Sequence, residues 1–202
     1  NENWEGGYRV PTLIRWPGTI KPGTVSNDIY SQMDMLPTLM AAAGVPDVKE
    51  QLLKGMQVGD KTFKVHLDGY NITDSLAGRA PDPRHEFFYF TDDGQLAALR
   101  FDQWKMVFQE QRAHGFEAWS EPFVARRVPL IFNLRTDPFE EAQHTAMDYQ
   151  HWMIDRVFLL VPAQQYVGQF LATFKEFPPS QKVGSFSLDQ VMEQLSAPAG
   201  SN

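Results

Sequence analysis

The fold is decided by residues 86–109, which read EFFYFTDDGQLAALRFDQWKMVFQ. Aromatic residues are frequent in this stretch, and they favour a pleated, half-buried sheet. The segment Asp92-Asp93-Gly94 interrupts the first apolar run and is a strong hairpin signal, because Asp-Gly tolerates positive φ angles. A long insertion at 110–128 precedes one more apolar run. The sequence therefore predicts a small antiparallel meander of four strands, at residues 86–91, 95–101, 104–109 and 129–134.

Helical patterns follow the predicted sheet. Apolar residues recur at helical spacing from Met153 to Phe174, with an interruption at Pro162. Further along, Ser187 and Gln190 match a capping box, which marks the first turn of a helix. We therefore expect helices on both sides of Pro162 and a last helix beginning near Ser187.

The segment RAPDPRH at residues 79–85 is rich in proline and charge, as linkers often are. Its composition differs from the aromatic stretch that follows. We therefore predict two units, residues 1–78 and residues 79–202, with the boundary in this segment.

The first unit is predicted to hold one buried strand and a few short elements. Val10–Trp16 ends in a short apolar run stopped by Pro-Gly and resembles a buried strand, which needs neighbours on both sides. A helix is expected to begin at Asp34, a good N-cap, and to end at Gly44. We also expect a short strand at Lys64–Leu67 and a turn of helix at Ile72–Leu76.

Composition excludes some classes of protein. A formal net charge of −7 over 202 residues argues against nucleic-acid binding, which requires a basic surface. No apolar stretch approaches the roughly 18 residues needed to cross a bilayer, so no membrane partner is expected. The chain has no cysteine, which excludes disulfides, cysteine-based zinc sites and a cysteine nucleophile from these 202 residues.

A search for chemistry finds no complete catalytic group. None of the five histidines has metal-ligand spacing, and only His66 stands out, since it lies where a predicted strand runs into the turn Leu67-Asp68-Gly69. The alternative interpretation is that His66 is only a hydrogen-bonded neighbour of a turn shaped by Asp68 and Gly69. Asp92-Asp93 could bind calcium but is more simply a turn, and Asp137 with Glu140 and Glu141 favours a turn followed by a helix N-terminus.

Several short motifs occur in a fixed order. They are WEGGYRVP at 4–11, RWPG at 15–18, SQMDMLPTL at 31–39, LDGYN at 67–71 and LRTDP at 134–138. Any one of them is weak evidence, but together and in this order they resemble the sulfatase family, near the arylsulfatases. The resemblance covers most of residues 4–175.

The resemblance implies an α/β fold. The chain would be the C-terminal part of the alkaline-phosphatase-like sulfatase fold, with a small four-stranded antiparallel sheet packed by a helix. Residues 1–78 would be the C-terminal segment of the large α/β domain, and residues 79–202 the small subdomain.

The resemblance also implies an activity, the hydrolysis of sulfate esters. Family members use a formylglycine nucleophile, made from the Cys or Ser of a C/S-x-P-x-R motif, and a calcium ion held by Asp and Asn residues. This chain has neither version of the motif. We therefore expect formylglycine and calcium to belong to a preceding N-terminal half, and the chain to be inactive alone. A lysine that contacts the sulfate in the family would fall just before Asn1.

Only four residues receive a role, and none is catalytic or a metal ligand. Glu5 and Arg9 are expected to form an ion pair that supports the segment behind that lysine. Trp4 and His66 are expected to line the rim of the substrate pocket.

Two other functions remain open on the sequence. One is a stand-alone binding module without catalysis, and the other is a phosphatase or phosphodiesterase of the same superfamily. A sulfate ester is the expected substrate, the family suggests a periplasmic or secreted location, and apolar faces left open could let the chain self-associate.

Overall fold

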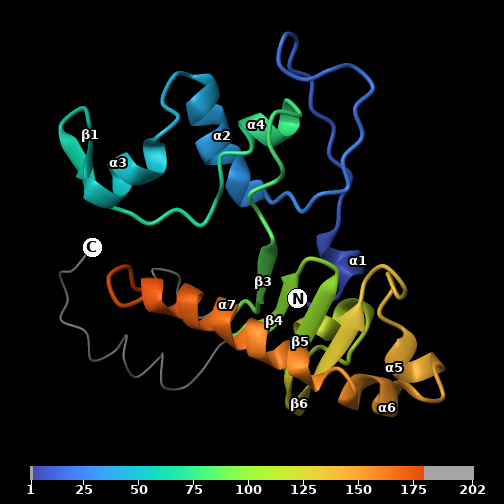
Figure 1. Ribbon diagram of the computed structural model, residues 1–202. Helices are drawn as coiled ribbons and strands as arrows, with labels where there is room; N and C mark the ends of the chain where they lie inside the picture. The colour runs from blue at the N-terminus through green and yellow to red at the C-terminus, as the bar shows by residue number, and fades with distance from the viewer. Residues whose placement is uncertain (1, 180–202) are drawn as a thin grey trace, which may run out of the picture.

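A computed structural model describes residues 2–179 of the chain and shows two lobes (Figure 1). One lobe is built on a four-stranded antiparallel sheet in the order β3-β4-β5-β6. Its strands are β3 (Glu86–Phe90), β4 (Leu96–Phe101), β5 (Trp104–Glu110) and β6 (Val124–Asn133). The predicted meander is therefore confirmed, although β6 begins earlier than expected.

The sheet connections follow from their turn residues. Gly94, between β3 and β4, has φ 73°, as the Asp-Gly signal predicts. Asp102, between β4 and β5, also has a positive φ, 48°, although it is not a glycine. Aspartate is among the few residues that accept this conformation, so the tight turn forms without glycine.

Side chains alternate between two apolar layers on the faces of the sheet. One face carries Tyr89, Ala98, Val107 and Phe132, and Trp4 packs against it. The other face is covered by the later part of the helical segment that follows β6, whereas Ala142 and Tyr149 of its earlier part pack with the first face; Figure 1 shows α7 running across the strands. The helices of this segment are α5 (Ala142–Thr145), α6 (Tyr149–Ile154), the 3-10 turn η3 (Val157–Leu159) and α7 (Leu160–Thr173).

The second lobe is made of short elements joined by long loops. They are the 3-10 turn η1 (Gln32–Asp34), α2 (Met35–Ala42), α3 (Val48–Lys54), the hairpin of β1 (Met56–Val58) and β2 (Lys61–Phe63), and α4 (Thr73–Leu76). The prediction of a strand at Lys64–Leu67 is wrong, because the hairpin ends just before it. The predicted turn of helix near Ile72–Leu76 is confirmed. The insertion after β5 contains one 3-10 turn, η2 (Gly115–Trp119).

Asp34 is the N-cap residue of α2, as the sequence predicts, but its side chain makes no capping hydrogen bond to that helix. Ser31 is the N-cap of the preceding turn η1, and its side chain accepts a hydrogen bond from the backbone of Met33. Asp34 completes the capping box by accepting from the Ser31 backbone N–H at 2.8 Å. The same carboxylate is fully buried and has further partners, so its role extends beyond this helix.

The prediction of a buried strand at Val10–Trp16 is wrong for this structure. The short helix α1 (Glu5–Tyr8) packs on the sheet, and the chain then runs without regular structure to Ser31. Leu13 is 100% exposed. Within residues 2–179 no strand lies beside this segment, so its backbone lacks the ladder partners that a strand requires.

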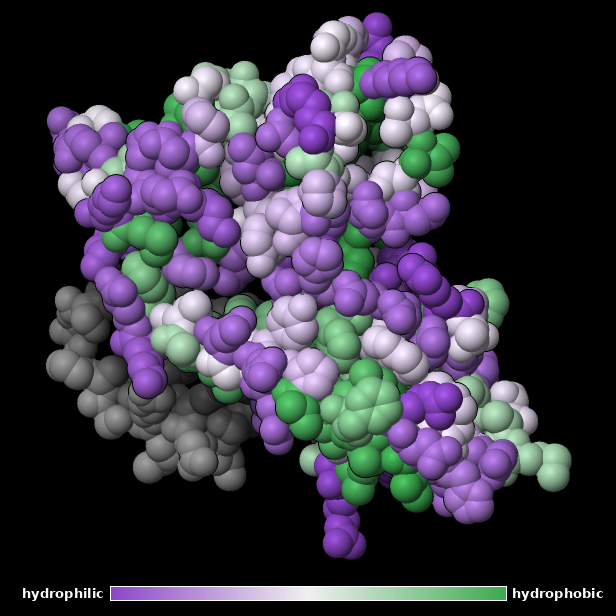
Figure 2. All heavy atoms as spheres, viewed as in Figure 1, coloured by the Kyte–Doolittle hydropathy of each residue, from purple (hydrophilic) through white to green (hydrophobic). Residues whose placement is uncertain are grey.

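Apolar side chains also lie exposed elsewhere on the surface. Figure 2 shows apolar atoms gathered over the beginning of α7, where Phe158 and Val161 are 63% and 60% exposed. In the other lobe, Leu36 and Leu39 of α2 are 51% and 65% exposed. In the described part of the chain, no helix is both long and apolar enough to span a bilayer. The helix predicted near Ser187 falls outside the described residues.

Candidate functional site

The side chain of Glu5 lies at the centre of a buried ionic network. Glu5 begins α1 and is only 1% exposed. Its Oε1 accepts a hydrogen bond from the Tyr89 hydroxyl and lies 3.4 Å from Lys105 Nζ. Its Oε2 accepts from Arg100 Nη1 at 3.1 Å. Two cations and a hydroxyl therefore compensate the buried charge of one carboxylate.

Lys105 connects this network to two other parts of the chain. It is the second residue of β5, is fully buried, and donates to the backbone oxygen of Asn3 at 2.6 Å. It also forms an ion pair with Glu140, with 2.7 Å between Nζ and Oε1. The second oxygen of Glu140 accepts from the backbone N–H of Glu5 at 2.6 Å. Residues 3–5 are thus held from both sides by groups more than 95 positions away.

The surroundings shift the pKa values of two groups in the network, Glu140 and Tyr89. Burial raises the pKa of Glu140, and the nearby charge of Lys105 opposes that rise. Burial also raises the pKa of Tyr89 well above its usual range, and the charge of Glu5 adds to the effect. Tyr89 therefore remains a neutral hydrogen-bond donor to Glu5 at any physiological pH.

The predicted ion pair between Glu5 and Arg9 is present but is not the main one. Arg9 Nε lies 3.9 Å from Glu5 Oε2, and the Arg9 side chain is 58% exposed. A solvated pair at that distance contributes little to stability. Arg100 and Lys105 are closer to Glu5 and far less exposed, so they hold it in place. The supporting role assigned to Glu5 and Arg9 in the enzyme stays a prediction.

Trp4 and His66 are not brought together. Trp4 donates its indole N–H to the backbone oxygen of Gln111 at 3.2 Å and contacts the apolar layer of the sheet. His66 lies in the other lobe, with Nδ1 3.2 Å from Asp68 Oδ1 and its ring 5.7 Å from the ring of Phe177. The substrate-binding role of both residues stays a prediction.

A second buried ion pair anchors the linker to the helical lobe. The guanidinium of Arg84 donates to both carboxylate oxygens of Asp34, at 2.5 and 2.9 Å. Both side chains are almost completely buried. Arg84 also packs over the ring of Tyr70, 4.7 Å from its centroid. This bidentate pair fixes the chain just before β3, where the two lobes meet.

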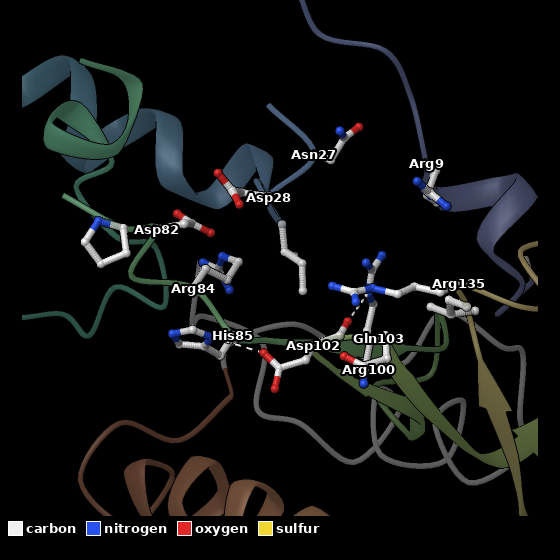
Figure 3. Close-up of a pocket in the computed structure, with 13 residues that line it drawn as sticks. Arg9, Asn27, Asp28, Asp82, Arg84, His85, Arg100, Asp102, Gln103 and Arg135 are labelled. Carbon is white, nitrogen blue, oxygen red and sulfur yellow. Dashed lines mark hydrogen bonds and ion pairs between the residues drawn. The ribbon is translucent and has the colours of Figure 1, made fainter. Parts of the chain in front are cut away.

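A pocket of about 410 Å³ lies between the lobes beside this ion pair (Figure 3). Figure 3 shows the side chains of Arg9, Arg100 and Arg135 on one side of it and the carboxyl groups of Asp28 and Asp82 on the other. The lining residues come from five separate segments of the chain: Arg9; Asn27, Asp28 and Ile29; Pro81, Asp82, Arg84 and His85; Arg100, Asp102 and Gln103; and Leu134 and Arg135. Trp4 and His66 do not line it.

Asp82 is the unusual group in this pocket. It is 9% exposed, and neither carboxylate oxygen has a hydrogen-bond partner in the described structure. Burial raises its pKa to about 6, and the nearby backbone N–H of Arg84 opposes that rise. Buried polar groups in folded proteins are nearly always paired, so this carboxylate needs an explanation.

The acidic residues do not form a calcium site in the described residues. No three His, Cys, Asp or Glu side chains among residues 2–179 are grouped to hold a metal ion. Glu5, Glu140 and Asp34 are each matched to a lysine or arginine. Calcium prefers six to eight oxygen ligands free of such partners, so the residues present do not fit this ion.

The sequence did not identify Lys105, Glu140 or Arg100 as part of a site. One signal was available, because Lys105 stands between apolar residues of a strand, where a lysine is seldom buried unless paired. Glu140 was assigned with Glu141 to a turn and a helix start. Glu141 does precede α5, but Glu140 turns inward with a φ of 58°.

Two family models match the chain. The model described as Sulfatase matches residues 1–45, and the model described as the C-terminal region of aryl-sulfatase matches residues 82–199, more than half of the chain. The two matches follow each other along the chain without overlap.

Relatives of known name are similar over about two thirds of the chain. Arylsulfatase from Hemicentrotus pulcherrimus is 29% identical over 160 residues, which is 69% of this chain and 26% of the relative. Arylsulfatase A from Homo sapiens is 31% identical over 148 residues, 68% of this chain and 26% of the relative. The chain thus spans about a quarter of the length of the curated relatives it matches.

A solved structure shows the same fold. The PsFucS1 sulfatase from Pseudoalteromonas sp. superposes with a TM-score of 0.58 and 23% sequence identity. The match covers 81% of this chain and 29% of that one. At this identity the likeness supports the fold alone, and it confirms the α/β sulfatase architecture with its small antiparallel sheet.

Proposed function

The chain belongs to the sulfatase family, and from that premise we propose that it is the C-terminal portion of an enzyme that hydrolyses sulfate esters. The observation that carries the proposal is the burial of Glu5 within the WEGGYRVP motif by Tyr89, Arg100 and Lys105. If the match to the motif were accidental, its glutamate would be expected at the surface without such partners. The burial of Glu5 therefore indicates that the motif has a structural role in this fold.

The contribution of this portion is positioning. In the family the lysine that contacts the sulfate precedes the glutamate of the motif by five residues, which places it next to Asn1. Lys105 holds the backbone oxygen of Asn3 at 2.6 Å, and the side chain of Asn3 accepts from the Gln111 backbone N–H at 3.0 Å. Polypeptide arriving at Asn1 is thereby held against the sheet, and orientation of this kind lowers the entropic cost of reaching the transition state.

The nucleophile and the metal belong to the remainder of the enzyme in this proposal. Formylglycine would supply the attacking oxygen there, and calcium would offset the charge of the sulfate. The acidic residues described above are engaged with lysine and arginine, so no calcium ligand is assigned in this chain. We extend the proposal to a periplasmic or secreted location, and to self-association of the isolated chain through its exposed apolar side chains.

The proposal is tested by comparing the chain with the natural polypeptide that contains it. Each is purified and assayed with 4-nitrophenyl sulfate in the presence of calcium. We expect turnover by the natural polypeptide and none by the 202-residue chain. Turnover by the chain alone would contradict its assigned role.

4-Nitrophenyl phosphate serves as the second substrate in the same assay. A natural polypeptide that hydrolyses the phosphate ester faster than the sulfate ester would favour a phosphatase and overturn the proposal. Absence of hydrolysis of either ester would leave a binding module as the better description.

A further inference from the structure

We propose that the solvent face of α7 is the docking surface for another segment of the same chain, residues 187–195, which packs on it as an antiparallel helix. These residues lie beyond the part of the chain that the structure describes, and the inference does not depend on the proposed hydrolysis. Four observations support it: the lack of charge on this face of α7, the apolar pattern of the segment, its short length, and the reach of the chain between the two.

The solvent face of α7 carries no charged residue. The sequence from Val157 to Phe174 contains no Asp, Glu, Lys or Arg, although α7 lies at the surface of the molecule. A surface helix of a globular domain ordinarily carries charged and polar residues opposite its buried stripe. The outer seam of this segment is instead formed by exposed residues that recur every three or four positions: Phe158, Val161, Gln165, Gly168 and Ala172.

The opposite side of α7 is already occupied by the sheet. Leu159 and Ala163 belong to the apolar layer there, and Phe170 stacks on Phe88 with 4.2 Å between the ring centroids. The seam therefore faces solvent only. Figure 2 shows apolar atoms gathered at its Phe158 end. A partner of the seam has to approach from solvent and to be apolar at this end.

Residues 187–195 read SLDQVMEQL and match that requirement. When the segment is drawn as a helix, its four apolar residues fall within an arc of about 100°, and its two acidic residues lie outside the arc. The apolar residues stand at i, i+3, i+4 and i+7: Leu188, Val191, Met192 and Leu195. One face of the segment is therefore apolar over its whole length.

A helix of this length needs a surface on which to pack. The segment is shorter than the roughly 12–15 residues at which an isolated helix becomes marginally stable in water, and short helices owe most of their stability to the packing of an apolar face. The family model described as the C-terminal region of aryl-sulfatase extends to residue 199. The segment thus lies within the region that the chain shares with this family, and we expect its surface to lie in the same domain.

The chain is long enough to bring the segment back along α7. Phe177 donates its backbone N–H to the carbonyl of Thr173 at 3.0 Å, so the chain leaves α7 close to the end of that helix. From Pro179 to Leu188 it can extend about 30 Å, whereas Gln165 lies about 18 Å from Phe177 at the helical rise. A tethered partner also has a high effective concentration, about millimolar for a short linker, which favours it over a second copy of the chain.

Disulfide trapping tests the antiparallel contact, because the 202-residue chain has no cysteine of its own. Phe158 and Gln165 lie about 10 Å apart along the seam, which exceeds the roughly 4.4–6.8 Å between Cα atoms that a disulfide allows. The matched pairs are Gln165→Cys/Leu188→Cys and Phe158→Cys/Leu195→Cys. The crossed pairs are Phe158→Cys/Leu188→Cys and Gln165→Cys/Leu195→Cys. After mild oxidation, peptide mass spectrometry should show at least about fivefold more intrachain disulfide in the matched pairs.

The shielding of the seam is measured separately, by the rate at which Val161→Cys reacts with a maleimide. Adding Leu188→Ser and Val191→Ser should raise this rate at least about fivefold, because the apolar contacts that cover the thiol are lost. The matched control adds Gln190→Ser, which changes the polar face of the same segment and should leave the rate unchanged. Met147→Cys, at a fully exposed position, gives the rate of an unshielded thiol.

Three outcomes would overturn the proposal. One is an equal yield of disulfide in the matched and the crossed pairs. Another is disulfide formed chiefly between two chains, which would make a second copy the occupant of the seam. The third is a Val161→Cys rate equal to that of Met147→Cys with or without the serine substitutions, which would show that nothing in this chain covers the seam.

Discussion

Replacing Lys105 with methionine removes the cation on which the buried network depends. Lys105 is fully buried and faces both Glu140, at 2.7 Å, and Glu5, at 3.4 Å. Methionine fills a similar volume, so the main effect is electrostatic. Removing one partner of a buried ion pair typically costs about 3–5 kcal/mol, because it leaves an uncompensated charge. Arg100 still compensates Glu5, and we therefore expect a loss of about 3–4 kcal/mol in the free energy of unfolding.

The double variant Lys105→Met/Glu140→Gln isolates the electrostatic part. Glutamine keeps an oxygen that can accept from the Glu5 backbone N–H, but it carries no charge. We expect the double variant to recover at least about 1 kcal/mol of the unfolding free energy lost in Lys105→Met. This value lies within the range of interaction energies that double-mutant cycles give for residues in contact. Urea denaturation followed by circular dichroism gives the free energies of all four proteins in the cycle.

The loss of unfolding free energy in Lys105→Met should also depend on pH. Burial already raises the pKa of Glu140, and without Lys105 nothing of comparable strength opposes the rise. A carboxyl group whose folded pKa lies above its unfolded pKa stabilises the fold at low pH and loses that contribution as pH rises through the folded pKa. The deficit of Lys105→Met should therefore be larger at pH 8 than at pH 4.5. A loss below about 1 kcal/mol at pH 8, or strictly additive single variants, would refute the reasoning.

Three smaller perturbations test other features. Asp82→Asn should raise the free energy of unfolding by about 1–3 kcal/mol at pH 8 and should not change it near pH 3.5. The reason is that the pKa of Asp82, about 6, exceeds the usual 3.8, so burial destabilises the fold only when the carboxyl group ionises. Melting curves of both proteins at the two pH values test this prediction. Gly69→Ala should cost about 3 kcal/mol, since its Cβ would lie 1.9 Å from the backbone oxygen of Met33, whereas Gly6→Ala has open space and should change stability by less than about 1 kcal/mol. Tyr149→Phe removes a hydroxyl bonded to both backbone groups of one β6 residue and should cost about 1–2 kcal/mol in urea denaturation; an unchanged midpoint would contradict the buried bonding.

The sheet could be predicted because its signals are local. The Asp-Gly turn at Gly94 and the apolar runs around it depend only on neighbours in sequence, so the four strands appear close to where they were expected. The strand predicted at Val10–Trp16 failed for the opposite reason. An apolar run becomes a strand only where other strands offer hydrogen-bond partners, and the described residues offer none there.

The buried networks could not be read from the sequence for a related reason. Glu5 is 100 positions from Lys105 and 135 from Glu140, and no local pattern encodes a contact at that separation. Asp34 shows the same limit. Its position before α2 could be predicted from neighbouring residues, but its bond to Arg84, 50 positions away, gave no local signal. The one local signal was Lys105, because a lysine between apolar residues of a strand is seldom buried unless it is paired.

The contacts that hold residues 3–5 against the sheet also imply an order of events during synthesis on the ribosome. Glu5 leaves the exit tunnel before Glu140, which is polymerised 135 positions later and accepts a hydrogen bond from the Glu5 backbone N–H. At about 5–20 residues per second, that interval lasts roughly 7–27 s. The partners of the Glu5 carboxylate, Tyr89, Arg100 and Lys105, are synthesised within that interval, 84, 95 and 100 positions after Glu5. The bond between the Glu5 backbone and Glu140 can therefore form only after all four strands of the sheet have been synthesised.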